Sequence, residues 1–128
     1  MQTAGRTSAQ RLGDAAESHV AALLDAAGWS VVARNVHIGH AEIDLIAIDP
    51  GSPPALVVVE VRWRSGRGFG LGEETVDHRK RARLRAAAWR WLEEHDHPML
   101  PLRFDLVIVE PGPRPGAVWR LRHHRSAF

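Results

Sequence analysis

The chain has 128 residues, which is enough for one hydrophobic core and too few for two, so we expect a single domain over residues 10–128. The absence of cysteine excludes disulfides and thiolate metal sites and fits a reducing cytoplasm. No apolar run reaches the roughly 18 residues of a membrane span, and residues 1–6 lack the apolar segment of a secretory signal, so we expect a cytoplasmic protein without a membrane partner.

The first expected element is a helix. Residues 1–9 are small and polar, and we expect a disordered N-terminal arm there. From about Gln10 to Ala27 apolar residues recur on one helical face, and Gly28 suits the position that follows a helix. Glu17 lies at the edge of this apolar face, so we expect its carboxylate to point toward the core.

Three strands are expected next, in segments that are rich in Val and Ile and bounded by Pro-Gly and Ser-Gly. They cover residues 29–36, 41–48 and 56–63. A glycine-rich loop at 65–72 leads to a second helix from about Glu74 to Glu94, which stops before Pro98. Strands at 103–109 and 117–122 complete the order, and the last alternates apolar and basic residues as an edge strand does.

Two carboxylates interrupt the second and third strands. Asp44 and Glu60 each lie within an apolar run, with 15 residues between the two acids, and the turn at 49–54 makes the two strands a natural hairpin. A buried carboxylate is costly unless a metal, a cation or several donors compensate it. Carboxylate oxygens, completed by water and phosphate, are how proteins hold a hard divalent cation. We therefore predict that Asp44 and Glu60 bind Mg²⁺ or Mn²⁺.

A cation accompanies this pair. Alternation along a strand places Glu42 with Asp44 on one face, and Glu60 with Arg62 on one face. Two metal ligands and one cation are the parts that phosphodiester cleavage needs, because charge develops on the scissile phosphate.

The competing interpretation is purely structural: the two acids would be ion-paired with Arg34, Arg62 or Arg64. We favour the metal site for three reasons: the spacing of the two acids, the additional acid Glu17, and the basic second helix.

Charge is unevenly distributed along the chain. The formal net charge is +2, and every base except Lys80 is arginine or histidine. From Arg62 to Arg90 nine arginine and lysine residues accompany three acids, and residues 120–125 carry a second group of three arginines. Clustered arginine is typical of a polyanion partner, while a solvated helix face in an arginine-rich chain explains the same pattern equally well on charge alone.

With these motifs in this order, the chain resembles the small, uncharacterised bacterial YraN-like proteins, which look like restriction-endonuclease-like nucleases of the Holliday-junction resolvase type. The resemblance covers roughly Arg11 to Val109 and rests on Gly13 with Glu17, Arg34-Asn35, Glu42-Ile43-Asp44-Leu45-Ile46, Val59-Glu60-Val61-Arg62-Trp63-Arg64, Phe69-Gly70, Val76 with Lys80, and Arg103-Phe104-Asp105. It implies the α-β-β-β-α-β core of that superfamily. It also implies that Asp44 and Glu60 match the acidic metal ligands and that Glu17 matches an accessory helix acid.

Two positions depart from the family pattern. Ala41 stands where glycine is usual, which is a minor change. Arg62 stands where the superfamily signature ends in lysine; arginine stays charged and can orient phosphate, but it cannot act as a base. Lys80 lies on the apolar face of the second helix and is a candidate to supply the ammonium instead. The alternative for Lys80 is a side chain that only covers Leu84.

We therefore expect a three-layer α/β domain with a mixed central sheet flanked by helices. Its expected function is that of a Mg²⁺-dependent nuclease for branched or single-stranded nucleic acid, DNA in the first place. The alternative is a non-catalytic nucleic-acid-binding or interaction module on a decayed nuclease scaffold. The expected site residues are Glu17, Asp44, Glu60, Arg62 and Lys80 for catalysis, and Arg64, Arg67, Arg79, Arg83 and Arg90 for nucleic-acid contact. The sequence leaves a homodimer, the preferred substrate structure and the choice between DNA and RNA open.

Overall fold

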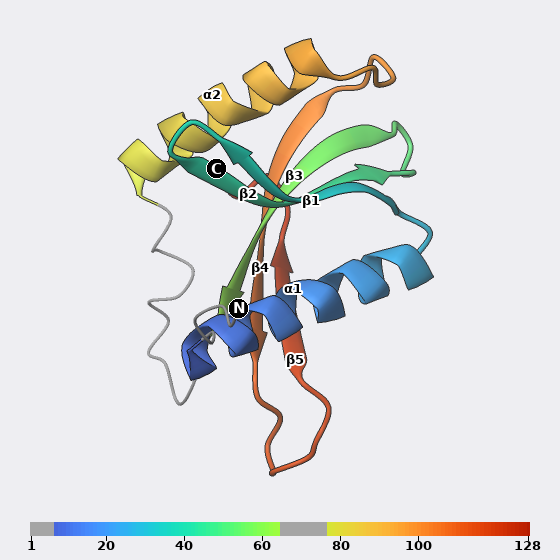
Figure 1. Ribbon diagram of the computed structural model, residues 1–128. Coiled ribbons are helices and arrows are strands. Elements are labelled where there is room, and N and C mark those ends of the chain that lie inside the picture. Colours follow the sequence, from blue (N-terminus) through green and yellow to red (C-terminus); the bar gives the residue numbers. More distant parts are fainter. Residues whose placement is uncertain (1–6, 65–76) are drawn as a thin grey trace, which may run out of the picture.

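The computed structural model describes residues 7–64 and 77–128 (Figure 1). Its elements are α1 (Ser8–Ala26), β1 (Ser30–Ile38), β2 (Ala41–Asp49), β3 (Ala55–Trp63), α2 (His78–Glu94), β4 (Leu102–Glu110) and β5 (Arg120–His124). The five strands form one mixed sheet in the order β1-β2-β3-β4-β5, in which only β3 and β4 are parallel. Figure 1 shows α1 and α2 on opposite faces of this sheet, so the predicted three-layer α/β fold is confirmed.

Both helices begin at capped residues, and both begin elsewhere than predicted. Thr7 and Gln10 form a capping box, so α1 starts at Ser8. Ser8 and Ala9, which were expected to be disordered, are therefore helical. Asp77 has extended backbone and its carboxylate accepts the Lys80 amide at 2.8 Å, so α2 starts at His78 rather than Glu74. Residues 1–6 and 65–76 lie outside the described residues.

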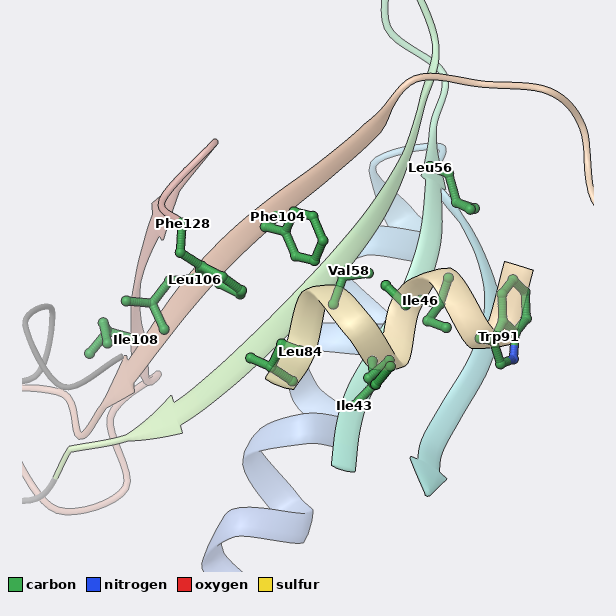
Figure 2. Packing of buried hydrophobic residues seen from close by; sticks show 12 residues of the cluster. Ile43, Ile46, Leu56, Val58, Leu84, Trp91, Phe104, Leu106, Ile108 and Phe128 are labelled. Carbon is green, nitrogen blue, oxygen red and sulfur yellow. The ribbon is translucent and has the colours of Figure 1, made fainter. Parts of the chain in front are cut away.

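Each helix buries one hydrophobic cluster against the sheet. Figure 2 shows the cluster on the α2 side, where Leu84 and Trp91 of α2 pack over side chains of β2, β3 and β4. The α1 side is built from Ala16, Val20 and Leu24 of α1 with valines of β3 and β4. Neither helix in the described part of the chain is long and apolar enough to cross a membrane.

The β1–β2 hairpin bends beside the carboxylates. Asn35 has φ of 51°, a left-handed conformation that asparagine tolerates better than most residues. On β2, Ile43 and Ile46 both pack into the α2-side cluster, so strict two-residue alternation fails between them. The regular alternation therefore breaks at Asp44, although Glu42 and Asp44 still line a common cavity. The pairing of β2 with β3 also ends here, at Leu45 and Val59.

The last strand is shifted from its predicted place. Residues 117–119 are not in a strand, because the Ala117 amide closes a turn onto the Arg114 carbonyl at 3.0 Å. Strand β5 begins at Arg120 and pairs antiparallel with β4 at the sheet edge, so its predicted edge position is confirmed.

A buried ionic network fastens the C-terminus to β4. The carboxylate of Asp105, whose side chain is 0% exposed, accepts two hydrogen bonds from Arg103 at 2.9 Å. It also accepts a hydrogen bond from His123 Nε2 at 2.8 Å and one from the Ser126 amide at 3.0 Å. Arg103 Nη1 reaches on to Asp49 Oδ2 at 2.9 Å. Burial alone would raise the pKa of Asp105, but these donors outweigh it and lower the pKa to about 2.

We predict that Asp105→Asn lowers the free energy of unfolding at pH 7 by about 2 kcal/mol, because it removes the buried charged acceptor of Arg103 and His123 and leaves Arg103 with Asp49 alone. The folded pKa lies below the unfolded value of about 3.9, so the contribution of Asp105 is present above that pH and is lost as the pH falls toward 2. Urea denaturation from pH 7 to pH 3 should show wild type losing more stability than the variant. Asp25→Asn, at an exposed position of α1, is the control, and parallel pH profiles for wild type and Asp105→Asn would contradict the network's role.

Candidate metal and phosphate site

Asp44 and Glu60 meet where β2 leaves β3. Beyond the last paired residues, Leu45 and Val59, the Val61 amide donates to Asp44 Oδ2 at 2.8 Å. Glu60 is 7% exposed, and it lines the same cavity as Asp44, close enough to act on the pKa of Asp44. The predicted proximity of the two carboxylates is therefore present in the structure.

This proximity perturbs Asp44 strongly. Burial, the hydrogen bond to Glu60 and the negative charge of Glu60 together raise the pKa of Asp44 to about 9, against the opposing effect of the Val61 amide. Two carboxylates this close are costly to ionise together, so the raised pKa of Asp44 favours a proton on the pair when no metal ion is bound.

Lys80 supplies the cation next to the pair. Its Nζ lies 3.2 Å from Glu60 Oε2, and its side chain is 31% exposed. The Asp77 cap places Lys80 in the first turn of α2, on the side that faces the sheet. The Lys80 ammonium thus forms an ion pair with Glu60, so Lys80 does more than cover Leu84.

The three side chains open into a common cavity, which we name the carboxylate cavity. It has a volume of about 170 Å³, and its polar lining includes His40, Glu42, Asp44, Glu60, Lys80 and Arg83. Its lining combines three acids with Lys80 and Arg83, which is the mixture of charges that a site for a cation and a phosphate needs.

Glu17 approaches the pair from the α1 side. It is 9% exposed, and its Oε1 is buried without a hydrogen-bond partner among the described residues. Burial, followed by the charges of Glu42 and Asp14, raises the pKa of Glu17. Its charge in turn contributes to the raised pKa of Asp44. Glu17 lines a separate cavity of about 400 Å³ with Arg34 and Glu42, so it is an electrostatic neighbour of the pair.

The residues present fit a magnesium ion with two protein ligands. Within residues 7–64 and 77–128 no group of three or more His, Asp or Glu side chains is arranged to hold a metal. Mg²⁺ does not require one, because it commonly takes one or two carboxylates and completes its shell with water and substrate phosphate. Asp44 and Glu60 are close enough to share a proton, and a cation can take that proton's place.

The predicted arginines fall into three groups. Arg62 is not among the described residues that line the carboxylate cavity, and Arg64 lies just after β3. Arg79, Arg83 and Arg90 are exposed on α2, and Arg83 borders the carboxylate cavity. Arg67 lies outside the described residues. The structure therefore brings Asp44, Glu60, Lys80 and Arg83 together, and His40 joins them as a residue that the sequence did not indicate.

We predict that the metal-free protein loses stability with rising pH because of Asp44. A folded pKa raised to about 9 means that the folded state holds a proton that the unfolded chain releases above about 3.9, so stability falls between these values. The slope for one proton is about 1.4 kcal/mol per pH unit. Denaturation in EDTA from pH 6 to pH 9 should show this slope in wild type and a flatter profile in Asp44→Asn. Equal slopes would show that Asp44 carries no such proton.

Comparison with known proteins identifies the family of this chain. Residues 16–109 match the family described as uncharacterised protein family UPF0102. A UPF0102 protein of Parafrankia sp. (strain EAN1pec) is 43% identical over 119 residues, which cover 93% of this chain and 97% of the relative. A UPF0102 protein of Symbiobacterium thermophilum is 44% identical over 104 residues, covering 81% of this chain and 86% of the relative. The predicted resemblance to the YraN-like proteins is thereby confirmed, and the chain belongs to the uncharacterised protein family UPF0102.

Proposed function

We propose that this protein is a Mg²⁺-dependent nuclease that acts on branched or single-stranded nucleic acid. The observation that carries the proposal is the position of Lys80, whose Nζ lies 3.2 Å from Glu60 and beside the Asp44–Glu60 pair. The superfamily signature that the sequence resembles ends in lysine, and this chain has Arg62 there. Lys80 brings an ammonium to the same carboxylate from the helix side.

Each residue of the carboxylate cavity has a distinct task in this proposal. Asp44 and Glu60 hold the cation, which when bound supplies Lewis acidity toward the phosphate and lowers the pKa of a coordinated water. The Val61 amide fixes the Asp44 carboxylate, so the ligand geometry is set before substrate binds. Lys80 orients the attacking water and, with Arg83, neutralises charge that develops on the phosphate.

The place of Lys80 on α2 adds to this electrostatic effect. Lys80 lies in the first turn of α2, and amides at a helix N-terminus favour a nearby anion. Arg62 cannot take over a proton-transfer role, because its guanidinium stays protonated.

One observation favours the alternative of a nucleic-acid-binding module on a decayed scaffold. Arg62 replaces the signature lysine, and an ion pair between Lys80 and Glu60 is also compatible with a purely structural role for both side chains. The two functions differ in a single respect, which is whether metal-dependent cleavage occurs.

We predict that Mn²⁺ and Mg²⁺ bind at one site per chain and that Asp44→Asn and Glu60→Gln each abolish binding while the fold is retained. Isothermal titration calorimetry measures the binding, and cleavage is assayed on labelled four-way junction, flap, single-stranded and duplex DNA with Mg²⁺, Mn²⁺ or EDTA. Glu93→Gln, at an exposed position near the end of α2, should bind and cut like wild type. Cleavage that persists in EDTA or in Glu60→Gln would point to a contaminating nuclease and remove the proposal.

We predict that Lys80→Ala lowers kcat by about 100-fold or more while KM changes little, because an interaction made in the transition state affects turnover rather than ground-state binding. Arg62→Lys should raise activity or leave it unchanged, since it restores the signature lysine. Arg81→Ala, a neighbouring exposed base on the other flank of α2, is the matched control. If wild type shows no metal-dependent cleavage and Lys80→Ala changes stability alone, the binding module is the correct function.

A further inference from the structure

A second cavity continues the carboxylate cavity along α2. This turn cavity, as we name it, has a volume of about 240 Å³ and lies between the β1–β2 turn and α2. It shares His40, Ala41 and Arg83 with the carboxylate cavity, so the two form one path. Arg90 lines its far end.

The turn cavity is mainly apolar, and two arginines are among its lining residues. Ala41, Ala86 and Ala87 give it a smooth wall without hydrogen-bonding side chains. Arg83 and Arg90 are both exposed, and they lie seven residues apart on one face of the helix, which is about 10 Å along its axis. An isolated phosphate would interact with the arginines but would make no use of the apolar wall. The lining therefore suits a ligand that has both an apolar face and negatively charged groups.

The guanidinium of Arg90 packs over the β1–β2 turn. Gly39 has φ of 59°, and a Cβ at this position would lie 3.6 Å from Arg90 Nη1. The guanidinium of Arg90 therefore lies directly over a turn that carries no side chain at that point. A nucleoside with a phosphate on each side combines an apolar base face with two negative charges, one for each arginine.

We propose that the turn cavity binds the nucleoside adjoining the scissile phosphate, with Arg83 and Arg90 on the phosphates that flank it. The inference rests on the proposed nuclease function for the position of the scissile phosphate. A base that packs against α2 and the β1–β2 turn has left its duplex stack, so it is not paired with a second strand at the same time. The turn cavity thus selects substrates with an unpaired nucleotide next to the cleavage point, as in single strands, flaps and opened junctions.

The test measures binding in EDTA, so that no metal-dependent cleavage occurs. Fluorescence anisotropy compares a short labelled oligothymidylate with a strand of equal length that lacks the bases, and with a blunt duplex. Wild type should bind the strand with bases about five to ten times more tightly than the abasic strand, within the range of one base contact. Ala86→Leu fills the cavity from an exposed helix position and should reduce oligothymidylate affinity to that of the abasic strand.

Two controls separate the cavity from general effects. Ala82→Leu adds the same side chain at an exposed position of α2 and should leave both affinities unchanged. Arg90→Ala should weaken both strands, because it removes a phosphate contact. The proposal is overturned if wild type binds the two strands equally, if it binds the blunt duplex as tightly as the single strand, or if Ala86→Leu weakens both strands alike. The wild-type comparison decides the matter even if a variant does not fold.

Its failure is distinct from failure of the nuclease proposal. If the protein cleaves DNA with metal but binds strands with and without bases equally, only the proposal of a nucleoside-binding cavity is wrong. Base-dependent binding without cleavage removes the nuclease function and leaves the turn cavity as part of a binding module.

Discussion

The close approach of the Asp44 and Glu60 carboxyl groups imposes the constraint on which the rest of the site depends. Two carboxylates held together in a partly buried place need a proton or a cation between them, and the pKa of Asp44, raised to about 9, expresses that need. Because the pairing of β2 with β3 ends at Leu45, the Val61 amide is free to donate a hydrogen bond that stabilises the Asp44 carboxylate. Lys80 of α2 stabilises the Glu60 carboxylate by an ion pair. A metal ion bound by both acids would compensate the negative charge that remains.

The chain order explains how these groups come together. Strand β3 carries Glu60, and the chain then passes to α2 before it returns as β4 parallel to β3. The first turn of α2 therefore lies near the Glu60 end of β3, and later turns extend along the β1–β2 hairpin. One helix thus presents Lys80 to the carboxylates and Arg83 and Arg90 to the path that leaves them. In this account the chemistry and the strand-binding surface share one rigid element.

Much of the fold could be predicted from sequence because the apolar patterns are strong. The order of the elements, the acid pair and the inward direction of Glu17 all follow from residues that contrast with their neighbours. Strict alternation failed at Asp44, because the left-handed Asn35 and the bend beside it are local events that periodicity does not encode. The partner of Lys80 required the tertiary packing of α2 on the sheet, since helical phase alone showed only that Lys80 faces inward.

The Asp105 network was missed for a similar reason. Arg103 and Asp105 are two residues apart on one strand, so alternation places them on the same face, and that signal was available in the sequence. His123 and Ser126 come from the segment beyond the shifted strand β5, and no spacing rule relates them to Asp105. Asp105 shows that a buried strand acid with several donors is satisfied without metal, whereas Asp44 has one amide and a second carboxylate. That difference in donors, rather than burial, separates the structural acid from the candidate ligand.

A crystal structure of the protein soaked in Mn²⁺ tests the central claim most directly. We predict an anomalous difference peak within about 2.5 Å of carboxylate oxygens from both Asp44 and Glu60, with the metal ion in place of any shared proton and the Lys80 ammonium still beside Glu60. A map without a peak at this position, with both acids still bonded to each other or paired with arginine side chains, would contradict it.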